Sequence, residues 1–525
     1  MKKMRRSCIA LTLAMCLACS MTGCGKKNVT DELKDLNNEG QEEVGEKPEG
    51  EDGASALSSA LAKKLDISAD ALKYEVRLDG RKTAYNVDAE VVIPAVDKVS
   101  VYEEQLLDLT EDKVISYAKN LFDGGNYEQK KPYAACTREE LDALKLDVQK
   151  AMTEAENVYV EDKWQWEEKI NELDFYLKYY IEPKETYTEG KYYNCQYYEA
   201  AKTDDDLAGR LLYYSRIMIL EGAIGGTPYQ LVAYQADPEY GECVNSYLKL
   251  YRENETWSQC SWQPTTPHYS MSEISGQENI CEFTEEEAAN SALNCMSMMG
   301  FENMEIVHTE WLYWQQTPIE NQDDDTYNPQ IVADGYSFFM ARSYNGVSGM
   351  YIPLGMGWLS ADGSSYAQQE SYVVNVSSEG VISVECGPLY ENIAVISEDA
   401  EMLSFDEVNA KAKEAFEEEI GKLAGSEEKT EGDTEEGTQN DSDEGTQNDA
   451  DEENGGGCAP VERGVVYVNW VKLACLNLQY DGKFRLTPVW VFASYTNEMQ
   501  YPEIIINALD GTRVKENDNV YRCIY

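Results

Sequence analysis

The fold is decided by a fourteen-residue pattern that occurs three times: LTEDKVISYAKNLF at 109–122, FTEEEAANSALNCM at 283–296 and LSFDEVNAKAKEAF at 403–416. Each copy begins with an apolar residue and then a Ser or Thr, whose hydroxyl can accept from the free N–H groups of a first helical turn. Small or apolar residues follow four, eight and twelve places later, which puts them on one helix face. Two copies also carry a capping-box glutamate, Glu287 and Glu407. The pattern therefore predicts three capped helices, each lying on an apolar surface.

Strand patterns follow the second and third of these helices. The apolar runs after the second are 304–315, 336–344, 347–352, 372–376 and 381–384, and after the third 465–480, 484–495, 503–507 and 512–514. Acid-Gly or Asn-Gly pairs separate several of the runs, as expected of hairpin turns. We therefore predict an α+β fold of repeated modules, each with one capped helix followed by an antiparallel β-meander. The alternative to a repeat is that well-capped helices resemble one another in any α+β protein.

The earlier part of the chain is more elaborate. Alternating runs on both sides of Asp79-Gly80 predict a hairpin with its apolar residues facing a core. Thr137 and Glu140 form the capping box of a helix that runs towards Ala155, and residues 164–180 have helical spacing. Further strands are expected at 187–200, 211–220 and 229–235.

The N-terminus, MKKMRRSCIALTLAMCLACSMTGCG at residues 1–25, has a basic head, an apolar run and small residues before Cys24. The run falls short of the roughly 18–20 apolar residues that span a membrane, so an export signal is indicated. It resembles a bacterial lipoprotein signal peptide, which implies cleavage after residue 23 and attachment of a diacylglyceryl group (palmitate) to Cys24. We therefore predict a lipoprotein held at the outer face of the cell membrane. An uncleaved signal anchor and a secretory signal cut elsewhere are the alternatives.

The net charge of -53 is unevenly distributed. Two low-complexity runs, Asp31 to Asp52 and Glu427 to Glu453, are almost free of basic residues and are predicted to be solvated and disordered. The predicted divisions are a signal peptide (1–23), an acidic tether (24–66), an N-terminal α+β domain (67–280), a second module (281–402), and a third module (403–525) interrupted by an acidic insert (426–457). Because nucleic acids bind basic surfaces, an acidic chain is not expected to bind them.

No residue pattern predicts catalysis, a metal or a cofactor. The two histidines, His268 and His308, have no catalytic setting, and the acidic clusters at 204–206, 323–325 and 441–443 do not complete a calcium loop. The ten cysteines after Cys24 contain no Cys-x-x-Cys pair. The sequence is compatible with two states of these cysteines, buried free thiols or disulfide bonds. Cys295 and Cys475 lie in apolar runs, which is typical of buried thiols.

The C-terminal strands at 484–492 and 504–512, with their Asn-Ala-Leu-Asp-Gly turn, resemble exported regulatory modules of Gram-positive bacteria, the YycI/YycH type and the PepSY-like domains. The whole chain resembles uncharacterised Gram-positive lipoproteins of similar layout. The resemblance implies a non-enzymatic binding or regulatory module whose partner is a membrane or envelope protein. The alternatives are an envelope-polymer hydrolase with paired carboxylates and a solute-binding lipoprotein that serves a transporter.

Overall fold

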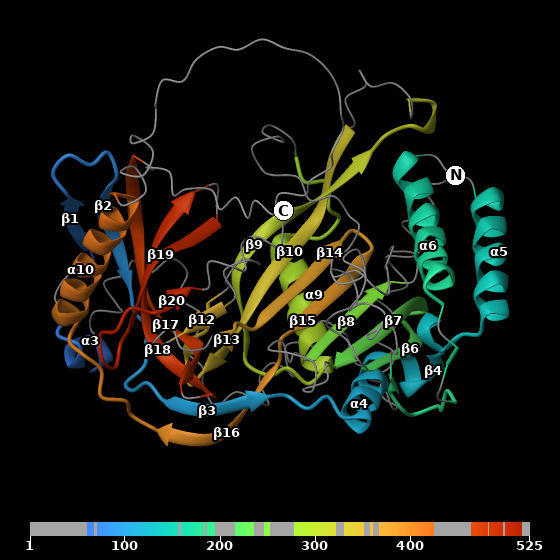
Figure 1. The fold of residues 1–525 in the computed structure, drawn as a ribbon, viewed down its shortest axis with the longest axis horizontal. Helices are drawn as coiled ribbons and strands as arrows, with labels where there is room; N and C mark the ends of the chain where they lie inside the picture. Colours follow the sequence, from blue (N-terminus) through green and yellow to red (C-terminus); the bar gives the residue numbers. More distant parts are fainter. Residues whose placement is uncertain are drawn as a thin grey trace, which may run out of the picture.

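The computed structural model describes residues 60–67, 71–155, 159–180, 182–183, 186–194, 216–235, 246–252, 278–321, 330–350, 358–360, 367–424, 464–480, 482–496 and 499–516. These residues form an α+β fold in which two large, mainly antiparallel sheets carry helices on their faces (Figure 1). Among the described helices, none is both long and apolar enough to cross a bilayer.

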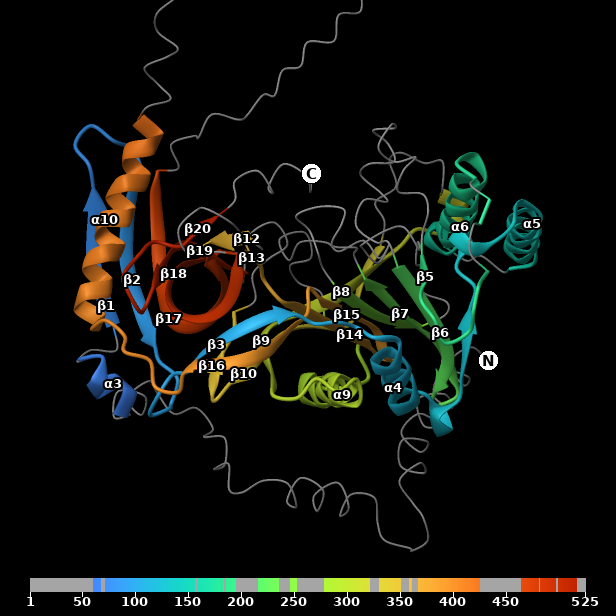
Figure 2. The same cartoon turned by 60° about the horizontal axis from the view of Figure 1, so that its bottom comes forward.

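The first sheet combines the beginning and the end of the chain. Its main strands run in the order β1-β2-β17-β18-β3-β16, and β19 also pairs with β18. Their bounds are β1 (Ala71–Arg77), β2 (Ala84–Val92), β3 (Val101–Leu106), β16 (Tyr390–Ser397), β17 (Val465–Tyr480), β18 (Lys483–Thr496) and β19 (Met499–Asn507), with short strands β12 (Trp358–Ser360), β13 (Ala367–Gln368) and β20 (Lys515–Glu516). β2 and β17 pair in parallel, and Figure 2 shows β17 and β18 curving strongly.

The second sheet is built from the middle of the chain, in the order β11-β10-β14-β15-β8-β7-β6-β4, with β9 beside β10 and β5 beside β6. The bounds are β4 (Tyr127–Lys130), β5 (Tyr193–Asn194), β6 (Arg216–Ile224), β7 (Thr227–Gln235), β8 (Ser246–Arg252), β9 (Met304–Gln316), β10 (Gln330–Tyr344), β11 (Val347–Ser348), β14 (Ser371–Ser377) and β15 (Gly380–Gly387). Each sheet thus takes strands from more than one of the three domains that the sequence predicts.

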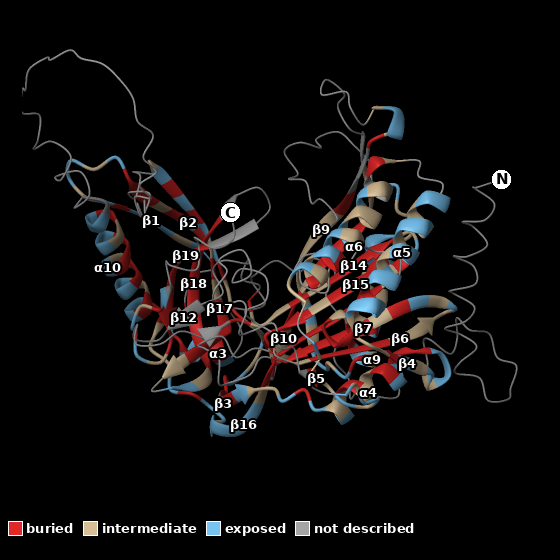
Figure 3. Ribbon diagram, turned by 45° about the vertical axis from the view of Figure 1, so that its right-hand side comes forward, coloured by how far each residue is buried: buried red, intermediate tan, exposed pale blue. Residues whose placement is uncertain are grey.

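All three helices of the repeated pattern form, as α4 (Glu111–Leu121), α9 (Glu285–Met298) and α10 (Phe405–Ala424). Thr110, Thr284 and Ser404 cap them, and Glu287 and Glu407 complete the two predicted capping boxes. The residues four, eight and twelve places after each cap are all buried: Val114, Ala118, Phe122, Ala288, Ala292, Met296, Val408, Ala412 and Phe416. α4 and α9 pack on the second sheet and α10 on the first, which confirms the predicted apolar faces (Figure 3).

Ser404→Ala tests the importance of these caps. The Ser404 hydroxyl accepts from the N–H of Glu407 and donates to its carboxylate, so alanine leaves a first-turn N–H without its acceptor. We expect the free energy of unfolding to fall by about 1 kcal/mol. Chemical denaturation would measure this fall, and Ser404→Thr, which keeps a hydroxyl, should lose much less. An equal loss in the two variants would contradict the role of the hydroxyl.

Two further helices, α5 (Arg138–Glu154) and α6 (Val160–Lys178), cover part of the opposite face of the second sheet. The Thr137–Glu140 capping box forms as predicted, and α6 begins four residues before the predicted start. Three short 3-10 turns complete the described elements: η2 (Asp123–Gly125), η3 (Tyr133–Ala135) and η6 (Ile319–Asn321).

The boundary predicted between tether and body requires a correction. Residues 60–66, assigned to the tether, belong to the folded body, because α3 (Ala60–Lys64) packs against the core of the first sheet. Leu61, Ala62 and Leu65 are fully buried there. Their apolar side chains stabilise the core, so this segment is not a solvated spacer.

The strands β3 and β16 form a two-stranded ribbon along the lower side of the molecule in Figure 1. β16 is the end strand of the first sheet, and Ile393, Val395 and Ile396 are exposed on it. Two register shifts interrupt its pairing with β3, and such bulges make an edge irregular and poorly suited to pairing with another strand.

Candidate functional site

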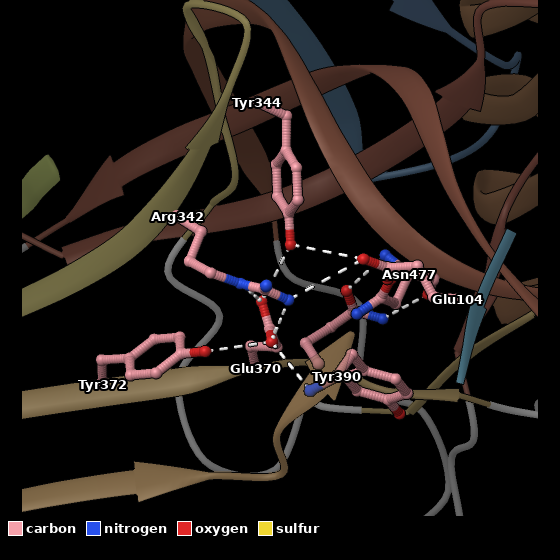
Figure 4. A network of polar contacts seen from close by, with 8 residues as sticks. Glu104, Arg342, Tyr344, Glu370, Tyr372, Tyr390 and Asn477 are labelled. Atoms are coloured by element: carbon pink, nitrogen blue, oxygen red, sulfur yellow. Dashed lines mark hydrogen bonds and ion pairs between the residues drawn. The ribbon is translucent and has the colours of Figure 1, made fainter. Parts of the chain in front are cut away.

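The best-defined group of charged residues lies where the two sheets meet. We call it the joint, and it consists of Glu104 on β3, Arg342 and Tyr344 on β10, Tyr372 on β14, Tyr390 on β16, Asn477 on β17, and Gln369 and Glu370 just before β14 (Figure 4). β10 and β14 belong to the second sheet and β3, β16 and β17 to the first. The joint therefore connects the two sheets through polar side chains.

Local structure explains why these side chains converge. Arg342 and Tyr344 are two residues apart on β10, so they share one face, the face that carries Phe338 and Met340 earlier in the strand. The turn at Asn345-Gly346 then brings the chain to Gly349, which pairs with Cys475 of β17 in the first sheet.

Arg342 and Glu370 make a two-pronged ion pair. The Nε of Arg342 donates to Oε2 of Glu370 at 2.9 Å, and its Nη2 donates to Oε1 at 2.5 Å. The Glu370 carboxylate also accepts from the hydroxyl groups of Tyr372 (3.0 Å) and Tyr344 (3.2 Å) and from the backbone N–H of Tyr390 (3.1 Å). Glu370 is thus held by donors from β10, β14 and β16.

Glu104 is the second carboxyl group of the joint, and its side chain is 0 % exposed. Its Oε1 lies 3.8 Å from Nη2 of Arg342 and 3.4 Å from the hydroxyl of Tyr344. Burial, followed by repulsion from Glu370, raises the pKa of Glu104 to about 8, and the attraction of Arg342 offsets only part of this. The single guanidinium is occupied by Glu370, so Glu104 is the carboxyl that holds a proton more tightly.

The joint is not arranged as a pair of catalytic carboxylates. A glycoside hydrolase needs two carboxyl groups that face the substrate, one of them ionised as nucleophile or base. Here Glu104 is fully buried, and Glu370 is occupied by Arg342, two tyrosines and a backbone N–H. What the arrangement can do is hold two sheets together and bind or release a proton.

A second buried pair lies within the second sheet. Lys249 on β8 stands directly opposite Glu385 on β15, with Nζ 3.7 Å from Oε2. Burial lowers the pKa of Lys249 and raises that of Glu385, and their mutual attraction opposes both shifts. This pair is a further contributor to the pH dependence of stability.

The residues singled out by the sequence lie elsewhere. Cys24, His268, the acidic clusters and the insert 426–457 are outside the described residues. His308 lies on β9, with its Nε2 3.0 Å from Oε1 of Glu310, and the joint does not include it. The described cysteines are all free thiols, namely Cys136, Cys281, Cys295, Cys386 and Cys475. Cys295 and Cys475 are buried as predicted, and burial raises the pKa of each to about 12.

No metal site is evident in the described part of the chain, where no three His, Cys, Asp or Glu side chains come together in a suitable way. Sequence reasoning missed the joint. The one available signal was Arg342, the lone charge of the apolar run 336–344 within β10, because an isolated charge in a buried stretch needs a partner.

Comparisons with known proteins give little further information. The chain matches no known protein family, and no curated protein matches it. It is similar to an uncharacterised protein from Eubacterium rectale ATCC 33656 of known crystal structure, with 11% identity and a TM-score of 0.35. The similarity covers 87% of this chain and 98% of that one. A similarity at this level supports no functional conclusion.

Proposed function

We propose that the protein is a lipid-anchored cell-surface protein that acts as a non-enzymatic binding or regulatory module. The observation that carries the proposal is the N-terminal pattern that ends at Cys24, with its basic head, short apolar run and small residues. Two acyl chains on one cysteine would hold the chain firmly, because each buried CH₂ contributes about 0.8 kcal/mol and a single myristoyl chain binds only marginally.

The distance between anchor and body supports a tethered module. The described part of the body begins with α3 at Ala60, about 35 residues after Cys24, a length that reaches at most ~120 Å. These residues are strongly acidic, and we propose that they act as the tether predicted from the sequence. A body held this way can reach a partner in the membrane or in the envelope.

We also propose that the body is made of repeated units, each a capped helix followed by a β-meander. α4 precedes β4, β6, β7 and β8, and α9 precedes β9, β10, β14 and β15. In the second sheet these sets run as β9-β10-β14-β15 and then β8-β7-β6-β4, so each ends at the β15–β8 pair. Both helices pack on the same face, and α10 precedes β17, β18 and β19 in the first sheet. The YycI/YycH-like and PepSY-like resemblance of the last unit fits a binding role.

The two alternatives have less support. A solute-binding lipoprotein would show alternating strands and helices with parallel sheets, whereas nearly all described strand pairs are antiparallel. For an envelope-polymer hydrolase, the carboxyl pair of the joint is a poor candidate because Glu104 is fully buried.

Cys24→Ala tests the anchor. The variant cannot form the thioether to diacylglycerol, so we expect it to lose fatty-acid labelling completely and to leave the membrane fraction, with the fold unchanged. Labelling cells with a clickable palmitate analogue and then fractionating them would measure both effects. Cys19→Ala is the matched control. Cys19 lies in the apolar run, so this variant should still be labelled at Cys24. Labelling that survives in Cys24→Ala would contradict the assignment.

The binding role needs its own test. Crosslinking on intact cells followed by capture of the full chain should enrich a specific membrane or envelope protein, and the Cys24→Ala variant should not enrich it. If nothing is enriched and the purified protein instead cleaves an envelope polymer, the hydrolase alternative replaces our proposal.

A further inference from the structure

We propose that the joint is a pH-dependent contact between the two sheets, in which the buried Glu104 carries a proton, and that loss of this proton loosens the contact. The inference concerns the folded body and does not depend on the lipid anchor. It rests on the number of charges in the joint and on the complete burial of Glu104.

The charges do not balance when both carboxyl groups are ionised. Arg342 supplies one positive charge, and it is 2.5 Å from Glu370 but 3.8 Å from Glu104. Burial does not remove the charge of Arg342, because the Glu370 carboxylate beside it raises its pKa. A protonated Glu104 leaves a neutral Arg342–Glu370 pair, whereas an ionised Glu104 leaves a buried surplus of negative charge, which is unfavourable in a low-dielectric interior.

Two acceptor atoms lie in this part of the joint without donors. Oε2 of Glu104 and Oδ1 of Asn477 are both buried, and neither has a hydrogen-bond partner among the described residues. The two side chains are neighbours in Figure 4, and a hydrogen bond with the Asn477 side chain lowers the pKa of Glu104, which offsets only part of the increase from burial and from Glu370. A proton on the carboxyl group of Glu104 removes a buried negative charge that Arg342, already paired with Glu370, compensates only in part.

Gln369 holds Asn477 in place for this contact. Its Oε1 accepts from the backbone N–H of Asn477 at 2.9 Å, and its Nε2 donates to the backbone oxygen. The backbone of β17 is therefore fixed beside Glu104. When Glu104 gives its proton to water, its carboxylate repels that of Glu370, and this repulsion weakens the contact between the two sheets.

Glu104 is the group expected to titrate near neutral pH. The titratable groups that face it from the other elements are Arg342, Tyr344, Glu370, Tyr372, Tyr390 and Cys475. Burial raises the pKa of each tyrosine well above its ordinary value and that of Cys475 to about 12, so these groups keep their protons. On β18 the residue opposite Glu104 is Phe484, which carries no charge.

The sign of the pH effect follows from this. The pKa of Glu104 is about 8 in the folded protein and near 4.5 in an unfolded chain, so between these values the folded state binds the additional proton. Stability from this group is complete below about pH 4.5 and is lost as the pH rises to about 8. One linked proton makes the unfolding equilibrium constant rise about tenfold per pH unit across this range.

Glu104→Gln in the full-length chain, purified in detergent, tests the proposal. Glutamine has nearly the size of the protonated acid and, like it, carries no charge. Denaturant unfolding is measured from pH 5 to 9. Between pH 5 and about 8 the unfolding equilibrium constant should rise with pH more steeply in the wild type than in the variant, by a factor of about ten per pH unit. Contributions from Lys249 and Glu385 are common to both chains and cancel in the comparison. Equal slopes would overturn the proposal.

Glu103→Gln is the matched control. Glu103 is the neighbouring residue on β3, but it points to the opposite face and pairs with Lys483 at 3.0 Å. The unfolding equilibrium constant of Glu103→Gln should change with pH as steeply as that of the wild type.

Glu370→Gln frees Arg342 to pair with Glu104, so the pH range in which the unfolding equilibrium constant rises steeply should move down by more than one pH unit. An unchanged position would also overturn the proposal.

Hydrogen exchange of the wild-type protein supplies a readout of the contact itself. At pH 9 the β3 and β17 amides should exchange faster in the wild type than in Glu104→Gln, and at pH 6 the two should agree. The exchange rates of the β6 and β7 amides, within the second sheet, should not differ between the two proteins at either pH.

If Glu104→Gln fails to fold, an infrared titration of the wild type and Glu370→Gln remains decisive. A protonated carboxyl band should persist above pH 7 in the wild type and be lost at lower pH in Glu370→Gln, and an identical band in both would overturn the proposal.

Discussion

Replacing Arg342 by methionine is expected to lower the free energy of unfolding by about 3–5 kcal/mol, because it leaves the Glu370 carboxylate buried without a cation. Methionine fills much of the same volume, so the loss reports on charge more than on packing. Glu370 would keep its bonds to Tyr344, Tyr372 and the backbone N–H of Tyr390. Urea denaturation at pH 7, followed by tryptophan fluorescence and by circular dichroism, would measure the loss.

A double-variant cycle separates the ion pair from other effects of the substitution. Arg342→Met combined with Glu370→Gln removes both charges, and removing both partners of a buried pair costs less than removing one. We therefore expect the double variant to be more stable than Arg342→Met alone. Arg342→Lys should lose an intermediate amount, since it keeps the charge but not the two-pronged geometry. If the double variant loses as much free energy of unfolding as the two single variants together, Arg342 and Glu370 do not interact directly.

Gly335→Ala is the second substitution with a large expected effect. Gly335 lies on β10 with a φ of +128°, a conformation that L side chains rarely adopt, at a register shift in the pairing with β9. A Cβ there would lie 2.1 Å from the backbone oxygen of Val376 on the neighbouring strand. Asn279 also bonds to both the N–H and the oxygen of Gly335, so the segment cannot shift without losing these bonds. Strain and overlap together should cost roughly 3–6 kcal/mol.

Gly80→Ala separates the two causes. Gly80 has a φ of +78°, but a Cβ there would meet nothing within 4 Å. It should therefore show only the backbone strain, roughly 1–2 kcal/mol. Thermal unfolding of both variants under identical conditions would measure the difference. If Gly335→Ala costs no more than Gly80→Ala, the close approach to Val376 is unimportant.

Local patterns in the sequence were enough to predict the elements whose partners are nearby. The hairpin about Asp79-Gly80 forms with Tyr74 opposite Val87, and the turns at Asn345-Gly346 and Glu379-Gly380 join paired strands. The buried faces of α4, α9 and α10 were also predicted, because capping and a spacing of four residues are properties of one short segment.

Long-range pairing was beyond such patterns. β3, β8 and β16 were not predicted, and β3 contains two adjacent glutamates that favour an exposed loop. The residues that determine the charge of the buried Glu104, Arg342 and Glu370, come more than two hundred residues later in the chain. The joint could not be predicted for the same reason: no single segment contains more than two of its charged residues.

The parallel pairing of β2 with β17 determines when the first sheet can form. Ala84 pairs with Val465, about 380 residues later, so a chain made from its N-terminus holds β1 and β2 as an isolated hairpin until synthesis is nearly complete. The strands of the second sheet all precede β17, so that sheet can assemble first. An isolated hairpin is at best marginally stable in water. The first sheet is therefore expected to fold last and slowly, and its unpaired early strands are the segments most in need of protection from aggregation while they wait.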